Sequence, residues 1–400
     1  MDLRFPPEVE TFRAEVREFL AEAMDPADVD GHADPSDLTG LDEDFERSLL
    51  RRAGARGWLA LHWPVEEGGL GLTLAHRAAF GREAAAAEAP LIDTAVTLAG
   101  APILRHASAE QRSTLLPAMV AGETIVCIGY TEAGAGSDLS AVATTATRVT
   151  TAPDADWILS GEKVLVTGAH KADWCLVVAR TDPVAPARDA MSMFLVRLDA
   201  SGVVVTRTRT ANDWTLGTIT FTDVRVPASS LLGEEGRGFA QMAAALADER
   251  SGFFWVGWAE QRLEDLLGHV RAAGIDDLAV PGGVARDLLA RCWTDTALAR
   301  ALALRVVAAQ ADGTDPTVIA ALSKVFVTEL LQRIASTGIA LLGPAGLLTA
   351  PLFGPADPGA PLRGRFAYDC VERLHPTISV GSNQIQRDVL AHRGLGLPTH

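Results

Sequence analysis

The sequence is poor in cysteine and in basic residues, and each shortage excludes a class of protein. Its four cysteines, Cys127, Cys175, Cys292 and Cys370, lie far apart without paired spacing, which argues against a disulfide framework and a cysteine metal site. The 35 Lys and Arg against 51 Asp and Glu give a net charge of −16, and no basic cluster offers a track for a phosphate backbone. We therefore expect reduced thiols, no metal and no nucleic-acid partner.

Long apolar runs and targeting signals are also missing from the pattern. We find no stretch of about 18 apolar residues that reads as a membrane span. The first 24 residues resemble an amphipathic helix rather than a signal peptide. A cytoplasmic protein without a membrane partner is the expectation. With 48% hydrophobic content over 400 residues, the chain can bury a large core, divided among two or three subdomains.

The hydrophobic pattern changes twice along the chain and predicts three domains. Residues 1–122 are helical in pattern, with apolar residues at helical spacing near the start. Residues 123–235 hold short alternating runs rich in Val, Ile and Thr, which are typical of an antiparallel β domain. From 236 to 400 the helical period returns. The helices predicted there span 237–272, 284–312, 316–342 and a last segment near 383–393, and the predicted fold class is α+β.

The loop at 131–138, T-E-A-G-A-G-S-D, carries the strongest functional pattern. It follows a β-rich run and combines two glycines with Thr131, Ser137 and two carboxylates. Glycines let a backbone approach a ligand closely, and amides with hydroxyls can cradle a phosphate or a flavin edge. Taken alone, the loop is more simply a tight turn, so its meaning depends on other motifs.

Two such motifs follow in order, W-I-L-S-G-E-K-V-L-V-T-G at 157–168 and G-S-N-Q-I-Q-R at 381–387. Together the three motifs resemble the acyl-CoA dehydrogenase family, whose pattern is a T-E-x-x-x-G-S-D loop, a W-x-L-x-G-x-K…T strand pair and a terminal G-T-S-x-I-Q-R helix start. Matches at 63–69, 110–117 and 221–227 extend the resemblance over nearly the whole chain. The resemblance implies an N-terminal helical domain, a middle antiparallel β-barrel-like domain and a C-terminal four-helix bundle.

The activity that the resemblance implies is α,β-dehydrogenation of an acyl thioester, an oxidoreductase reaction on a CH–CH group with FAD as cofactor. In that reaction a carboxylate removes the proton next to the thioester carbonyl while a hydride passes to flavin N5. The implied substrate is an acyl-CoA or acyl-carrier protein of fatty acid or steroid metabolism. The implied electron acceptor is an electron-transferring flavoprotein, and the implied assembly is a homo- or hetero-oligomer, either dimer or tetramer.

By resemblance, the cofactor contacts transfer to matching positions of this sequence. Thr131 corresponds to a threonine beside the isoalloxazine, Ser137 to a serine near the pyrophosphate, and Thr167 to a threonine at the reactive edge. Leu165 stands where the family has a tryptophan, so some shielding of the ring is lost. The predicted cofactor-binding residues are Thr131, Gly136, Ser137, Thr167, Gly343, Gly346, Ser382 and Gln384, with Gly343 and Gly346 in a turn that supports the adenine side in a neighbouring subunit.

The catalytic base poses a separate problem. Many family members place a glutamate directly before the terminal Gly-Thr/Ser pair, but that position here is Val380, which cannot accept a proton. A minority carry the glutamate on a helix before an arginine, and Glu249 precedes Arg250 at that place. We therefore predict Glu249 as the base and the Val380 backbone amide, with the flavin ribityl hydroxyl, as the oxyanion donors. The alternatives are a solvated helix residue at Glu249 and Asp248 as the base.

Substrate contacts are predicted at Ser137, Arg250, Gly252 and Phe253, since Gly252 and Phe253 share the helical face of Glu249. The aromatic residues at 253–258 suggest an acyl cavity that is shorter or shaped for a ring. Plain core packing explains such an aromatic stripe at least as well.

The segment at 274–284 departs from the family pattern. An R-x-x-x-F-G…Q segment that reaches a neighbouring subunit's flavin is replaced here by two acids, which would repel a pyrophosphate. The loop resembles heteromeric bacterial members, including those acting on steroid side chains, and harmless drift of a loop is the alternative. Two other functions therefore stay open: a non-catalytic or partner-dependent subunit, and a family member recruited to a flavin-dependent oxidation in biosynthesis.

Overall fold

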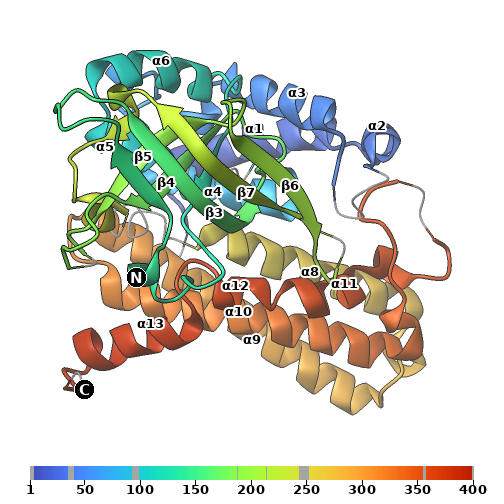
Figure 1. Cartoon of the computed structure of the whole chain (residues 1–400). Helices are drawn as coiled ribbons and strands as arrows, with labels where there is room; N and C mark the ends of the chain where they lie inside the picture. The colour runs from blue at the N-terminus through green and yellow to red at the C-terminus, as the bar shows by residue number, and fades with distance from the viewer. Residues whose placement is uncertain are drawn as a thin grey trace.

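The chain passes from helices to strands and back to helices, which confirms the predicted order (Figure 1). The computed structural model describes residues 4–34, 40–91, 99–186, 188–212, 214–242, 252–354 and 357–398. Figure 1 shows the strands beside the N-terminal helices in the upper half of the view, with the long C-terminal helices side by side below them.

The N-terminal helices bury aromatic side chains against one another. They are α1 (Pro7–Ala23), α2 (Pro26–Val29), α3 (Glu43–Gly54), α4 (Leu74–Ala86), α5 (Gly100–His106) and α6 (Ala109–Val120). Phe12 and Phe19 of α1 each meet the Trp58 ring edge-on, with centroids 5.6 and 5.3 Å apart. At the start of α6, Ser108 and Gln111 form a capping box. The Gln111 side chain also donates to the Ser229 carbonyl at 2.7 Å, which ties α6 to the strand domain.

The middle domain is a mixed sheet rather than a wholly antiparallel one. Its strands are β1 (Val126–Gly129), β2 (Thr145–Arg148), β3 (Trp157–Thr167), β4 (Trp174–Arg180), β5 (Met191–Arg197), β6 (Val203–Arg209), β7 (Thr215–Val226) and β8 (Leu231–Leu232). They run in the order β6-β7-β3-β2-β4-β5-β8, and β1 pairs with β4. The β1–β4 pair is parallel, because the long connection between these strands lets the chain cross over before it returns in the same direction.

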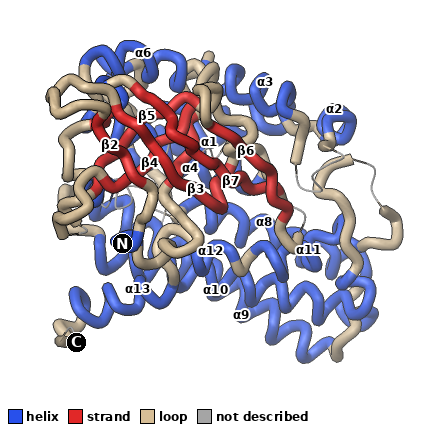
Figure 2. Tube along the Cα trace, in the orientation of Figure 1, coloured by secondary structure: helices blue, strands red, loops and turns tan. Residues whose placement is uncertain are grey.

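Strands β4 and β5 lie side by side in this sheet (Figure 2), and nearly all of their residues are buried. On β4, Leu176 and Val178 belong to a core shared with α6, whereas Cys175 and Val177 belong to a second core with Trp157. Continuous apolar runs are typical of strands covered on both faces. Trp157, Leu159 and Val166 of β3 belong to the second of these cores, so β3, which contains the motif at 157–167, packs against β4.

The C-terminal domain is built on three long helices. Its elements are α8 (Phe253–Ala273), α9 (Gly282–Ala311), α10 (Thr317–Leu342), α11 (Arg365–Glu372), α12 (His375–Ile378) and α13 (Asn383–Val389). The predicted segments 284–312 and 316–342 agree with α9 and α10, and α13 lies in the predicted last helix. Sequence analysis did not identify α11, a short helix that buries Phe366, Ala367 and Asp369. Of the predicted segment 237–272, residues 243–251 lie outside the described residues.

Helix α10 is the central helix of this bundle. By length and composition, Thr317–Leu347 is apolar enough to cross a membrane, which the sequence analysis did not single out. The helix nevertheless packs against α8, α9, α11 and α13, and fourteen of its residues are buried. Its apolar character is therefore explained by its place in the core.

A buried ionic cluster joins the N-terminal domain to the C-terminal helices. Glu88 follows α4 at φ 53° and accepts hydrogen bonds from Arg262 of α8 and, at 2.5 Å, from Arg365 of α11. Arg262 Nε also lies 2.7 Å from Asp369 Oδ2. Burial by itself would raise the pKa of the Glu88 carboxyl, but the Arg262 and Arg365 guanidiniums outweigh it and lower the pKa to about 2.

We predict that Glu88→Gln lowers the free energy of unfolding by about 3 kcal/mol at pH 7, because Arg365 loses its carboxylate partner Glu88 and the buried Arg262 loses one of its carboxylate partners. The folded pKa of about 2 lies below the ordinary 4.5, so this stabilisation is complete above pH 4.5 and is lost as the pH falls toward 2. Denaturant unfolding at several pH values measures both effects. The control is Glu264→Gln, at an exposed position of α8, and equal losses in the two variants would contradict the prediction.

Candidate active site

The loop at 131–138 is attached to β3 through its backbone. The Val164 amide donates to the Thr131 carbonyl at 2.9 Å. Glu132 and Ala135 exchange two backbone hydrogen bonds of 3.0 Å, which close the loop into a tight turn. The structure therefore brings two of the predicted motifs together, with Thr131 beside the middle of β3 and Thr167 at its end.

A buried ion pair fixes the same loop. Lys163 of β3 is fully buried, and its Nζ lies 2.7 Å from Oε1 of Glu132. Glu132 also accepts from the amides of Ala143 and Thr144 at 2.7 and 3.0 Å. Burial lowers the pKa of the Lys163 ammonium, which the carboxylate opposes. Because an isolated buried ammonium is very costly, Glu132 and its loop are held where this charge requires them.

The far side of the loop is open. Gly136 and Ser137 are exposed, and a Cβ placed on Gly134 or Gly136 would meet no atom within 4 Å. Neither glycine has a positive φ, so neither packing nor backbone conformation within the chain requires a residue without a side chain. Room for the close approach of a ligand is the remaining physical reason, and it fits the flavin contacts predicted here.

Leu165 occupies an unusual conformation between Lys163 and Thr167. It has φ 56° and lies where the pairing of β3 with β7 shifts register. Its side chain is 61% exposed. The bulge therefore turns a large apolar side chain outward at the position where the family carries a ring-shielding tryptophan.

The turn before α13 is strained. Val380 has φ 55° and Gly381 has φ 78°. A positive φ is a genuine outlier for a β-branched residue and costs of order 1–3 kcal/mol. Within the described part of the chain, no acceptor is recorded for the amides of Val380 and Gly381. The turn thus has two neighbouring backbone N–H donors, and the side chain of Val380 cannot titrate.

Ser382 and Gln384 follow this turn. The Ser382 side chain accepts from the Ile385 amide at 3.3 Å and so begins α13, while Gln384 is exposed. The tip of the β6–β7 hairpin contacts α11 and α12, the two helices that precede this turn in the chain. Trp214 lies 5.5 Å from the His375 ring.

This hairpin contact connects the surroundings of the turn to Thr167, which the sequence predicts at the reactive edge of the flavin. Asn212 donates to Glu372 at 2.7 Å, and burial raises the pKa of that carboxyl. The strand that follows the tip pairs Leu216 with Thr167. The hairpin thus links the surroundings of Val380 to the end of β3 through a short chain of contacts.

Gly343 and Gly346 lie elsewhere in the same chain. They form the turn after α10, whereas α13 packs near Lys324 in the first half of that helix. Nineteen residues of helix separate Lys324 from Gly343, which corresponds to roughly 28 Å. The structure therefore does not gather these glycines with Ser382, and their contact with the flavin of a neighbouring subunit stays a prediction.

The predicted base and its neighbour, Glu249 and Arg250, lie outside the described residues. Gly252 caps α8 with φ 69°, and Phe253 is buried against Phe5 with ring centroids 5.5 Å apart. This contact agrees with the core-packing alternative for Phe253. Its role in substrate binding, like that of Gly252, stays a prediction.

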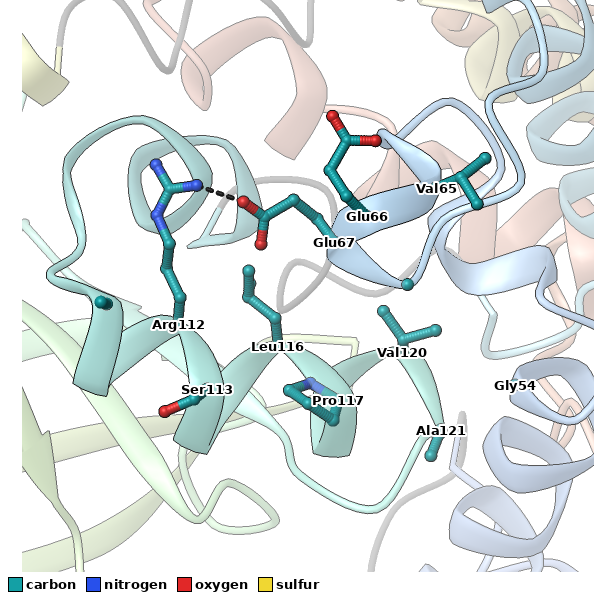
Figure 3. Close-up of a pocket in the computed structure, with 12 residues that line it drawn as sticks. Gly54, Val65, Glu66, Glu67, Arg112, Ser113, Leu116, Pro117, Val120 and Ala121 are labelled. Atoms are coloured by element: carbon teal, nitrogen blue, oxygen red, sulfur yellow. Dashed lines mark hydrogen bonds and ion pairs between the residues drawn. The ribbon is translucent and has the colours of Figure 1, made fainter.

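A cavity of about 710 Å³ opens between α6 and the turn at 65–68 (Figure 3). Arg112 on α6 donates to Glu67 across it and also to the carbonyls of Leu104 and Ala107. The family-like motifs at 63–69 and 110–117 thus form its walls. Their charged residues are engaged in holding the N-terminal domain together, and the predicted flavin contacts do not line this cavity.

Sequence reasoning missed several residues that organise the site. Lys163 belonged to a recognised motif, but its buried partner Glu132 was not identified. The signal was available, because a lysine in the buried register of a strand that holds Trp157 and Leu159 requires a counter-charge. The hydrogen bond from Lys324 to Asn383 had a similar signal, a lysine within an apolar stretch of α10.

The fold and site define a three-domain protein with an open glycine loop on a rigid strand and a strained, donor-presenting turn. Three family models match the chain: the acyl-CoA dehydrogenase N-terminal domain at residues 6–123, the middle domain at 127–224 and the C-terminal domain at 236–395. The chain belongs to the acyl-CoA dehydrogenase family, flavoprotein oxidoreductases that act on CH–CH bonds with FAD as cofactor.

Individual relatives extend over the whole chain. Acyl-CoA dehydrogenase IpdE1 of Mycolicibacterium smegmatis is 32% identical over 415 residues, covering 98% of each chain. Among solved structures, the Tcur3481-Tcur3483 steroid ACAD has a TM-score of 0.88 at 28% identity, covering 100% of both chains. The ChsE4-ChsE5 complex from Mycobacterium tuberculosis has a TM-score of 0.87 at 28% identity, with the same coverage.

We predict that Glu132→Gln lowers the free energy of unfolding by about 3–5 kcal/mol, because the Lys163 ammonium stays buried without a charged partner. The loop is then no longer held to β3, so FAD affinity falls as well. Thermal unfolding and flavin titration measure the two effects. Glu162→Gln, the same change at an exposed neighbour on β3, is the control, and matching behaviour of the two variants would count against the role of the pair.

Proposed function

We propose that the chain catalyses FAD-dependent α,β-dehydrogenation of an acyl thioester, with Glu249 as the base that removes the α-proton. The observation that carries this proposal is the turn at Val380, which combines free backbone donors with a hydrocarbon side chain. A thioester oxygen bound there would gain hydrogen bonds as negative charge develops on it. The proton must then be taken by a group from another element, because valine cannot accept one.

The base must come from a segment next to α8 for this proposal to hold. Glu249 precedes Gly252, the residue that caps α8, by three residues in the sequence. The bound flavin supplies the hydride acceptor. The role of the chain is to hold the α-carbon between the base and the flavin, to polarise the carbonyl and to exclude water.

The acyl group is proposed to be bulky and presented by CoA or a carrier protein. Support comes from solved neighbours described as steroid ACADs and from the aromatic cluster on α8. In that cluster the ring centroid of Phe254 lies 4.6 Å from that of Trp255 and 5.5 Å from that of Trp258. The Arg373 guanidinium stacks 4.2 Å from the Trp258 ring. An electron-transferring flavoprotein is the proposed acceptor of the electrons.

We predict that Glu249→Gln abolishes dehydrogenation while the flavin spectrum stays nearly intact, because the change removes the proton acceptor and keeps the side-chain shape. Anaerobic bleaching of the flavin by a panel of straight-chain and ring-bearing acyl-CoA esters is the measurement. Asp248→Asn is the matched control and should keep most of the activity. Near-normal bleaching in Glu249→Gln would remove the assignment of the base.

A second proposal concerns the assembly, which follows from the acidic segment beside the Gly343 turn. The Ala279 amide donates to the Leu341 carbonyl at 3.0 Å, so the segment lies against the end of α10. Asp276 and Asp277 are exposed there. Both the Asp276 carboxylate and the Arg286 guanidinium of α9 lie close to Gly282. A surface with these acids repels a pyrophosphate, which favours an unlike subunit as the supplier of the missing flavin contacts.

We predict that the chain expressed alone retains FAD below one equivalent per chain, and that co-expression with an unlike family subunit restores full occupancy. The reason is that half of the adenine-side contacts would then come from the partner. Native mass spectrometry with flavin quantification measures assembly and occupancy together. A tight homo-oligomer with one FAD per chain would contradict the need for a partner.

A further inference from the structure

A buried polar network connects the core of α10 to the start of α13. Lys324 and Asn383 are each 3% exposed, and Lys324 Nζ donates to Asn383 Oδ1 at 2.8 Å. The Asn383 amide nitrogen donates in turn to Thr328 Oγ1 at 3.2 Å and to Glu329 Oε1 at 3.1 Å. Arg387 of α13 also lies 2.5 Å from Glu329. Every contact of this network therefore ties the first turns of α13 to one face of α10.

The network is costly, because it places an ammonium inside the most apolar helix of the chain. Burial lowers the pKa of Lys324 to about 8, against the attraction of Glu329. An apolar pair of similar volume would pack this interface at less cost in desolvation. Joining two helices therefore does not explain why these contacts are polar. Buried polar networks whose hydrogen bonds are satisfied are known to hold a protein in one specific geometry.

The geometry they fix is that of the strained turn. Asn383 is the first residue of α13 and follows Val380 by three positions. From the same helix, Gln386 donates to the Gly381 carbonyl at 3.3 Å. A β-branched residue persists at φ 55° only where the surroundings determine its conformation. The network holds α13 directly after the turn, and Gln386 holds the Gly381 carbonyl within it, so together they fix the backbone of the turn.

We propose that Lys324 and Asn383 are positioning residues that hold the Val380–Gly381 turn, so that the Val380 amide stays preorganised as a donor to the thioester carbonyl oxygen. This inference rests on the proposed dehydrogenation. Neither side chain touches the substrate in this account. They act by preventing the turn from relaxing to negative φ, which would move this donor away from the oxygen before the reaction begins.

The expected effect is on turnover rather than on cofactor binding. Loss of a single oxyanion donor lowers kcat by about 100- to 1000-fold in other enzymes, and a donor that is still present but less ordered should cost less. We expect Lys324→Met to lower kcat by about tenfold or more. The KM and the Kd for FAD should stay within about threefold, because the loop at 131–138 is untouched.

The experiment compares Lys324→Met with Thr337→Val in the FAD-loaded protein. Thr337 is also buried on α10 and also loses a polar contact, that with Cys292, but it lies 13 residues further along the helix. Hydrogen exchange followed by mass spectrometry reports on the backbone of residues 376–384, and steady-state rates use the acyl-CoA ester that the unmodified protein oxidises fastest. Faster exchange and lower kcat are expected for Lys324→Met alone.

The outcomes separate this inference from the proposed function. Unchanged exchange in Lys324→Met, or equal changes in both variants, overturns the positioning role. If the unmodified protein oxidises no thioester, the dehydrogenase proposal fails, and the exchange comparison still decides whether the network orders the turn. Asn383→Ser breaks the same network from the other side, so it replaces Lys324→Met if that variant does not fold.

Discussion

The ion pair between Lys163 and Glu132 determines where the site is built. An ammonium with no exposure, placed on a strand whose Trp157 and Leu159 belong to an apolar core, has few ways to be neutralised. Its carboxylate partner Glu132 belongs to the loop at 131–138, and the backbone of that loop is hydrogen-bonded to β3 between the Thr131 carbonyl and the Val164 amide. Thr167 ends the same strand, about 10 Å beyond Val164. One electrostatic requirement thus holds the loop that carries Thr131 against the strand that ends at Thr167.

Sequence alone predicted those features that follow from local pattern. The periodicity located α9 and α10 to within two residues. Two of the three motifs, the loop with Thr131 and the strand that ends at Thr167, are joined by a backbone hydrogen bond, whereas the grouping of Ser382 with them stays a prediction. It did not predict α11, whose eight residues are too few for a convincing period. It also did not predict the φ of Val380 or the partners of Glu88. A backbone angle against the residue's own preference, and an ion pair between distant segments, exist only through tertiary packing.

Helix α10 divides the candidate cofactor residues into two groups. Its first half holds α13 and the Val380 turn through Lys324, and its far end carries Gly343. A straight helix keeps these groups roughly 28 Å apart. In the proposed assembly, the acidic segment beside Gly343 would therefore act on a flavin held by another subunit, while the Val380 turn would serve the flavin bound by its own chain.

The valine at position 380 separates two functions that a single glutamate combines in other family members. A glutamate there supplies both a base and a backbone donor, so its conformation cannot reveal which function maintains the turn. Valine retains only the backbone, and it does so at a φ that disfavours β-branched residues. If only the side chain mattered, the turn would be free to relax once the carboxyl was absent. Its persistence, together with the costly network behind it, indicates that the backbone donors are what this part of the fold is built to maintain.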